Sequence, residues 1–241
     1  MKTAMGLLLA AWLAAMPAAA AAAEPALVPY VIEYDVRYGG FADGTSRTEL
    51  TRGATSGQWV IEWNINASGF WKLVLGGTVS YRSNFLLEGS AVRPLSFRLD
   101  DGSGQTDKDV TLDFDWRTGR VRGMAEDEPV DLAVESGLQD AASIQAQVQA
   151  KLRSGAEPGL VAMIEDDRIK HYRYTLLRRE KLVTAIGALD TVVYRSARDG
   201  SGRETLTWYA PSLGYAAVQA EQLRDGKRKL RMTVRRYEAR N

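Results

Sequence analysis

Apolar and polar residues alternate along most of this chain, and this pattern limits its fold more than any other feature. Residues 31–38 place Ile32, Tyr34 and Val36 on one side of an extended backbone and charged residues on the other. A period of two is typical of strands with one buried face. The pattern returns in residues 59–66, 79–87, 110–116, 171–177, 191–196, 204–209 and 229–237. We therefore predict a mainly β protein, an antiparallel meander with one face toward water.

Short dipeptides that favour tight turns separate these runs. They are Asp43-Gly44, Asp101-Gly102, Thr118-Gly119, Asp199-Gly200 and Asp225-Gly226. Their positions between alternating segments predict hairpins that join neighbouring strands.

Residues 138–155 break the strand pattern and have the spacing of an amphipathic helix. An apolar stripe is formed by Leu138, Ala141, Ile144, Val148 and Leu152, and the opposite face carries Gln145, Gln147 and Gln149. Asp140 is a suitable N-cap, and Gly155 is a suitable stop. We predict one helix, from Asp140 to Leu152, that covers an open end or face of the sheet.

Residues 1–23 have the features of a secretory signal peptide. Lys2 supplies the positive charge, residues 5–15 are an apolar run too short to span a bilayer, and residues 21–23 fit the small-residue cleavage pattern. We expect export, with a mature chain that begins near Glu24 and forms a single β-rich domain over residues 24–241. No later stretch has the length of a membrane span, so we expect no transmembrane segment.

The overall charge argues against one class of partner. The chain has 31 basic and 30 acidic residues, a formal net charge of +1, whereas a nucleic-acid binder carries a clear basic excess. Cysteine is absent. An exported chain without cysteine has no disulfides, so its core must supply the stability.

The sequence has few residues of the types that form catalytic and metal sites. There is one histidine, His171, and it lies in an alternating run that predicts the wet face of a strand. The acidic segment 101–109 lacks the ligand spacing of a calcium loop, and residues 165–167 predict a solvated turn. Asp113 and Asp115 share one face of a strand, as many solvent-facing acidic pairs do. We expect no enzymatic activity, no metal and no cofactor; the alternative is a hydrolase of envelope polymer that uses acidic residues.

The last predicted strand has a basic outer face. Lys229, Arg231 and Arg235 alternate with apolar residues. These side chains either contact an anionic envelope surface or protect a sheet edge from aggregation, and the second interpretation is favoured.

Large aromatic residues are the candidates for a ligand site. The candidates are Trp59, Trp63, Phe70, Trp71 and Trp208. Trp59 and Trp63 share a strand face, and a glycine-flanked stretch carries Phe70 and Trp71. Such residues usually belong to a core, and we interpret Trp208 as a core residue near a rim. A sheet that curls without closing nevertheless leaves a concavity for a ligand.

Several segments together resemble a family of exported bacterial proteins known as domain of unknown function 3108. They are YVIEYDVRYGG, WNINASGF with VSYRSNF, LEGSAVRPLSFRLDDG, the helix after LQDAASIQ, VTAIGALDTVVYRSARDGSGRETLTWYAP and YAAVQAEQLRDGKRKLRMTV. The resemblance covers residues 29–237, and it implies a periplasmic protein with a single curled sheet or open β-barrel, similar to the half-barrel of lipoprotein carriers. It implies no enzymatic activity and no assigned ligand.

Taken together, the residues and the resemblance predict a non-enzymatic periplasmic binding or carrier module for an apolar or amphipathic molecule of the cell envelope, such as a lipid. The alternative is a periplasmic interaction or assembly protein that binds an envelope protein partner and no small ligand.

Overall fold

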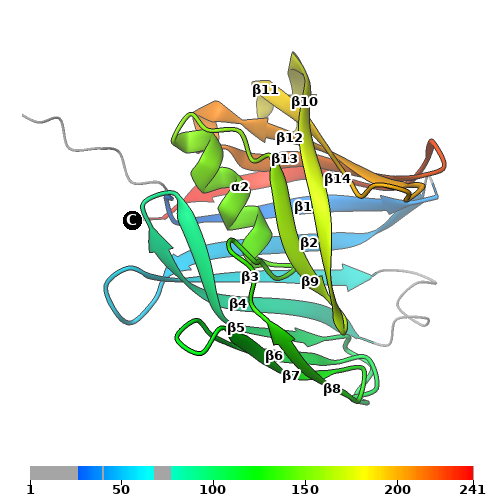
Figure 1. The fold of residues 1–241 in the computed structure, drawn as a ribbon. Helices are drawn as coiled ribbons and strands as arrows, with labels where there is room; N and C mark the ends of the chain where they lie inside the picture. The colour runs from blue at the N-terminus through cyan, green and yellow to red at the C-terminus, as the bar shows by residue number, and fades with distance from the viewer. Residues whose placement is uncertain (1–26, 40, 68–76, 241) are drawn as a thin grey trace, which may run out of the picture.

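The computed structural model describes residues 27–39, 41–67 and 77–240, and it shows one curled antiparallel sheet with a helix on its inner side (Figure 1). The first group of strands is β1 (Tyr30–Tyr38), β2 (Phe41–Arg52), β3 (Gln58–Ala67), β4 (Thr78–Glu88), β5 (Ala91–Asp100), β6 (Val110–Asp115), β7 (Arg120–Ala125) and β8 (Glu128–Ala133). The second group is β9 (Leu160–Glu165), β10 (Arg168–Thr184), β11 (Gly187–Ala197), β12 (Arg203–Ala210), β13 (Ala216–Arg224) and β14 (Lys227–Ala239). Helix α2 (Ser143–Arg153) separates the groups, and a short 3₁₀ helix, η1 (Pro211–Leu213), joins β12 to β13.

The two groups meet at the middle of the sheet. The strand order is β8-β7-β6-β5-β4-β3-β2-β1-β14-β13-β12-β11-β10-β9, so β1 pairs with the last strand, β14, and the edges are β8 and β9. These edges do not pair with each other, and the sheet remains open. The predicted curled antiparallel sheet with one helix is therefore confirmed. No helix in the described part of the chain is long and apolar enough to cross a membrane.

The inner face of the sheet carries the alternating apolar residues, as the sequence predicts. Cross-strand partners in β1–β8 bring these side chains into one core that includes Ile32, Leu50, Ile61, Phe85, Val92, Phe97, Leu112 and Val121, all of them buried. This core lies between the sheet and one side of α2.

The segment between β8 and α2 links the edge strand β9 to β5 at Gln139. Its backbone N–H donates to Ala162 O of β9 (2.9 Å), and its side-chain Nε2 donates to Val92 O of β5 (2.8 Å). β5 pairs with β6 around Phe97, but this pairing does not extend as far as Val92. Buried backbone groups require hydrogen-bond partners, and polar side chains supply them here.

Helix α2 is buried on more sides than its apolar stripe predicts. Gln147 and Gln149 lie on the face opposite the stripe, yet both are buried. Gln147 Oε1 accepts a hydrogen bond from Val92 N (2.8 Å), and Gln149 Oε1 accepts one from the Tyr30 hydroxyl (3.3 Å). The helix begins at Ser143, with the Asp140 carboxylate accepting hydrogen bonds from the backbone N–H groups of Ala142 and Ser143.

One predicted turn is wrong. Asp43-Gly44 lies inside β2, where Gly44 pairs with Val36 and the register shifts between Val36 and Arg37. The extra residue of the Asp-Gly dipeptide is accommodated by a bulge rather than a hairpin. The other four dipeptides lie between strands as predicted, and Asp225-Gly226 joins β13 to β14 with positive φ at both residues (51° and 71°).

Candidate functional site

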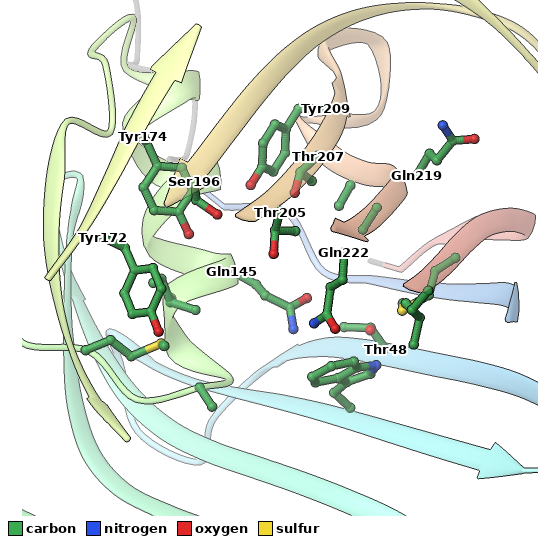
Figure 2. Close-up of a pocket in the computed structure, with 18 of the residues that line it drawn as sticks. Thr48, Gln145, Tyr172, Tyr174, Ser196, Thr205, Thr207, Tyr209, Gln219 and Gln222 are labelled. Carbon is green, nitrogen blue, oxygen red and sulfur yellow. The ribbon is translucent and has the colours of Figure 1, made fainter. Parts of the chain in front are cut away.

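A cavity of about 300 Å³ lies between α2 and the inner face of the sheet, mostly on the side of β9–β14 (Figure 2). Helix α2 and the segment before it contribute Ala141, Ile144, Gln145 and Gln149. The sheet contributes Tyr30, Tyr34, Thr48, Trp63, Met163, Glu165, Tyr172, Tyr174, Ser196, Arg203, Glu204, Thr205, Thr207, Tyr209, Ala217, Gln219, Ala220, Gln222, Leu230 and Met232. Binding pockets for small molecules commonly measure about 300–1,000 Å³, so the cavity suits a small ligand or one portion of a larger ligand.

Tyrosines form much of the cavity wall, and they remain neutral. Burial raises the pKa of Tyr174 to about 12, and it also raises the pKa values of Tyr30, Tyr34 and Tyr209. The Tyr34 hydroxyl donates to Ala217 O (2.8 Å), which ties β1 to β13 across the cavity. The tyrosines therefore present apolar ring faces, with hydroxyls held by the protein.

Three other polar side chains have no hydrogen-bond partner within the described residues. Gln145 projects from α2, and Thr205 and Gln222 project from β12 and β13 into the same space (Figure 2). Thr205 and Gln222 are cross-strand partners, which places their side chains next to each other on the inner face. Their amide and hydroxyl groups are available to hydrogen-bond an uncharged polar group of a ligand.

Charged residues lie toward one end of the cavity. Glu165 accepts a hydrogen bond from Lys170 Nζ (2.8 Å) and another from the Tyr172 hydroxyl. Burial by itself would raise the pKa of Glu165, but these hydrogen bonds outweigh burial and hold the pKa below its ordinary value. Glu204 pairs with Arg195. Both acidic groups of the lining are therefore paired, and the lowered pKa of Glu165 is the opposite of what a general acid needs.

Of the predicted ligand residues, Trp63 lines the cavity. Its indole Nε1 donates to Ser46 Oγ (2.7 Å), and its ring stacks on Tyr81 with the centroids 4.7 Å apart. Trp59 shares the strand face but is buried in the filled core, under the Arg52 guanidinium. Phe70 and Trp71 lie outside the described residues.

Trp208 lies on the other side of β12 from the cavity. Thr205, Thr207 and Tyr209 line the cavity, and Trp208 between them points away because strand side chains alternate. Its indole donates to Glu180, and the Arg178 guanidinium lies 5.6 Å from the ring centroid. It is buried by these β10 side chains, so it does not contact the cavity.

The predicted basic strand is largely neutralised on its outer face. Arg231 pairs with Glu221, and Arg235 pairs with Glu33 (3.3 Å). Lys229 makes no ion pair within the described chain and lines a separate hollow near the end of β13, together with Arg203 and Arg224.

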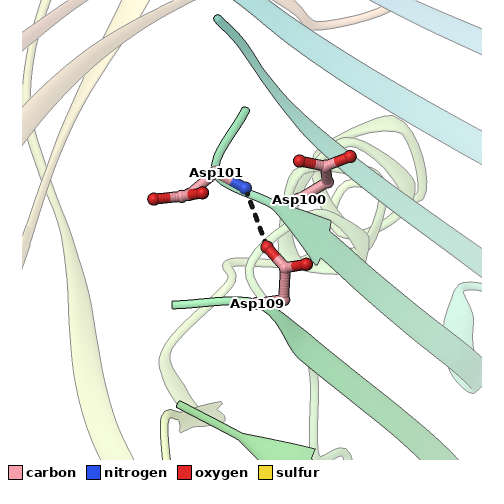
Figure 3. Close-up of side chains that lie close together, drawn as sticks. All are labelled: Asp100, Asp101 and Asp109. Atoms are coloured by element: carbon pink, nitrogen blue, oxygen red, sulfur yellow. Dashed lines mark hydrogen bonds between the residues drawn. The ribbon is translucent and has the colours of Figure 1, made fainter. Parts of the chain in front are cut away.

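One group of three carboxylates, Asp100, Asp101 and Asp109, lies close together beside the turn after β5 (Figure 3). Each carboxylate accepts a hydrogen bond from a backbone N–H group. Asp109 Oδ1 accepts one from Asp101 N (3.2 Å), Asp100 Oδ1 accepts one from Gly102 N (2.8 Å), and Asp101 Oδ1 accepts one from Ser103 N (2.9 Å). The hydrogen bonds from Ser103 lower the pKa of Asp101. These carboxylates hold the turn, and no metal is assigned to them. Asp113, one of the two acidic residues that share a face of β6, pairs with Arg98 (2.9 Å).

Sequence reasoning missed most of the cavity wall. The missed residues include Tyr172, Tyr174, Ser196, Thr205, Thr207, Gln145 and Gln222. A signal was present, because hydroxyl-bearing residues occupy the inward positions of β10–β12, whereas the buried positions of β5–β7 carry apolar residues. Attention to tryptophan alone did not detect it.

The fold and the cavity define a class of protein, an open β-barrel-like sheet that is hollow on part of its inner side. Residues 33–233 match the family described as "Protein of unknown function (DUF3108)", and the chain belongs to this family. The resemblance seen in the sequence is confirmed. No curated protein matches the chain.

One solved structure shares the fold. A crystal structure of a β-barrel-like protein of domain of unknown function DUF1849 from Brucella abortus is similar with a TM-score of 0.54 and 10% identity, over 89% of this chain and 99% of that chain. A "putative exported protein with YmcC-like fold" from Bacteroides fragilis has a TM-score of 0.39 and 10% identity, over 89% of this chain and 97% of that chain. The first likeness shows the fold alone, and the second score is too low to support a conclusion.

Proposed function

We propose that this protein is an exported, non-enzymatic binding or carrier protein that holds an amphipathic molecule of the cell envelope in its cavity. The observation that carries the proposal is the mixed lining. The wall combines the apolar surfaces of Tyr174, Trp63 and Met232 with the amide of Gln145 and the hydroxyl of Thr205, neither of which has a hydrogen-bond partner among the described residues. An amphipathic ligand matches such a wall, because its apolar part contacts the rings while its polar groups satisfy the amides.

The chemistry of the lining supports a binding role over catalysis. His171 lies outside the cavity, exposed and 2.8 Å from the Glu135 carboxylate. The two acidic residues of the lining, Glu165 and Glu204, are each engaged by a basic side chain. Export is supported by the signal pattern of residues 1–23, which lie outside the described residues.

The assembly alternative has less support. The exposed large apolar side chains of the described chain are Tyr38, Met124, Leu160, Leu177 and Val183. They lie on four strands, β1, β7, β9 and β10. Isolated exposed apolar residues are normal on protein surfaces, whereas a binding surface for a protein forms a contiguous patch.

Binding of an uncharged apolar dye, N-phenyl-1-naphthylamine, tests the proposal. We expect its fluorescence to rise with the wild-type protein and the rise to be lost in Thr205→Trp, which fills the cavity. Thr111→Trp places the same side chain at an exposed position of β6 and should bind like wild type. No dye binding by the wild type, or equal binding by both variants, would contradict the proposal.

Trp63→Ala separates a cavity wall from a filled core. We expect dye affinity to fall about tenfold, because a large ring contact is lost, while stability falls by less than the roughly 3–5 kcal/mol typical of truncating a fully buried aromatic. The denaturant midpoint and the dye affinity are measured on the same preparation. If Trp63→Ala lost as much stability as a fully buried aromatic does and kept the dye affinity of wild type, Trp63 would not be part of the binding site.

A further inference from the structure

A second hollow, of about 430 Å³, adjoins one end of the cavity. It is lined by Glu165, Lys170, Tyr172, Arg198, Ser201, Gly202, Arg203, Arg224 and Asp225. Glu165, Tyr172 and Arg203 line both spaces. The hollow therefore continues the cavity toward the loops after β11 and β13.

This hollow has an excess of positive charge. Its lining holds four basic and two acidic side chains, an excess of two positive charges. Lys170 and Glu165 neutralise each other through their 2.8 Å contact. The remaining Arg198, Arg203 and Arg224 make no ion pair with any described residue. Some other arginines of the sheet have a carboxylate partner on the neighbouring strand, as Arg98 has Asp113 and Arg231 has Glu221.

Two of these arginines face each other directly. Arg203 of β12 and Arg224 of β13 are cross-strand partners, two residues along from the Thr205–Gln222 pair that faces the cavity. Like charges at opposed positions destabilise a sheet. An anion placed between the two guanidinium groups would turn this repulsion into paired charge-assisted hydrogen bonds.

A third hollow extends the basic surface. It is lined by Tyr38, Arg203, Gln222, Leu223, Arg224, Asp225, Lys227 and Lys229. The Arg203–Arg224 pair thus lies between two hollows. Both arginines are exposed, so an anion bound there keeps part of its hydration and avoids the large cost of burying a charge.

We propose that Arg203 and Arg224, with Arg198, bind the acidic head group of the ligand whose uncharged part occupies the cavity, so that the ligand class is an anionic amphiphile bearing a phosphate or a carboxylate. This inference rests on the proposed function. It assigns the neutral wall around Thr205 and Gln222 to the body of the ligand and the arginines to its charged end.

The test compares matched ligands for displacement of bound N-phenyl-1-naphthylamine: a lysophosphatidic acid, the monoacylglycerol with the same acyl chain, and inorganic phosphate. We expect wild type to bind the lysophosphatidic acid about tenfold more tightly than the monoacylglycerol, as charge-assisted hydrogen bonds predict. The double variant R203Q/R224Q should lose this preference and keep its affinity for the monoacylglycerol. The control K108Q/R117Q removes the same charge at exposed positions away from both hollows and should keep the preference.

The outcomes separate the two proposals. Equal displacement by both amphiphiles in wild type, or loss of the preference in the control as well, would overturn the head-group site and leave the cavity standing. Binding of inorganic phosphate as tight as that of the lysophosphatidic acid, measured by calorimetry, would assign the arginines to a free anion instead. Absence of any dye binding would overturn the proposed function, and this inference with it. Because the opposed charges repel, R203Q/R224Q should melt no earlier than wild type, which checks that it folds.

Discussion

The inner face of one continuous sheet is filled on one side and hollow on the other. In β2–β7 the inward residues Leu50, Ile61, Phe85 and Val121 are fully buried and packed together. In β10–β13 the inward residues include Tyr174, Ser196, Thr205 and Gln222, and they surround a cavity. Both halves show the same alternation. The period of two selects which side chains point inward, and their size and polarity decide whether the space is filled.

The helix is attached more firmly to the filled half. Gln147 hydrogen-bonds the Val92 N–H and Ser90 O (2.8 and 3.1 Å), and Ser83 Oγ donates to the Asp140 carboxylate (2.7 Å). On the other half the helix packs on Val192, Tyr194 and Tyr209 through the apolar side chains of Val148 and Leu152. Asymmetric docking of α2 therefore leaves the space that becomes the cavity.

The largest expected effect is in the filled half. Phe85→Ala should lower the free energy of unfolding by about 3–5 kcal/mol, because the removed ring leaves a void in a closely packed core. Tyr174→Ala, on the hollow half, should cost no more than about 2 kcal/mol, since its ring already borders empty space. Chemical denaturation of both variants measures the difference. Equal losses would show that the two halves are packed alike.

A buried carboxylate in the filled half gives an intermediate, pH-dependent effect. Burial raises the pKa of Asp140 from its ordinary 3.8 to about 6, against the opposing hydrogen bonds from Ser143, Ser83 and Ala142. Between these values the folded state keeps the proton and the unfolded state releases it, so wild-type stability falls as pH rises. Asp140→Asn stays neutral. The free energy of unfolding of Asp140→Asn, relative to that of wild type, should therefore rise by about 3 kcal/mol between pH 4 and 6 and stay constant above pH 6.

Denaturation of both proteins across this pH range measures that gain, and Asp131→Asn supplies a control of opposite sign. Its hydrogen bond with Arg120 lowers the pKa of Asp131, so this carboxylate stabilises the wild type at neutral pH. That advantage is lost only as pH falls below the ordinary value of 3.8, so the difference between Asp131→Asn and wild type should stay constant between pH 4 and 6, and the measurements extend below pH 3.8. A constant difference between wild type and Asp140→Asn at all pH values would show that Asp140 is not held in a desolvating environment.

The smallest effect is expected where the two ends of the sheet approach each other. His171 of β10 contacts Glu135 of the segment after β8 (2.8 Å), and both side chains are about half exposed. Exposed pairs contribute less than about 1 kcal/mol. His171→Ala should therefore change the denaturant midpoint slightly and leave dye binding unchanged. Loss of binding in a folded His171→Ala protein would require a catalytic or positioning role for this histidine.

Much of the fold was predictable because its causes are local. Alternation in residues 31–38 and 110–116 predicts β1 and β6, and Asp-Gly and Thr-Gly dipeptides predict the turns that join neighbours. Asp43-Gly44 failed as a turn because a bulge in β2 accommodates it. The cavity wall was less predictable. Trp63 lines the cavity, but Trp59 on the same strand face lies in the filled core.

The sequence by itself determined the β class, many of the strands with their inward sides, and the helix α2, because backbone geometry and burial act within a few residues. Only the tertiary structure decided which inward residues border empty space. Arg203 and Arg224 oppose each other through strand pairing, and Gln147 is buried because β6 leaves the Val92 N–H without a strand partner. Such neighbours depend on how far the sheet curls and where α2 docks, and no local pattern of residues encodes either quantity.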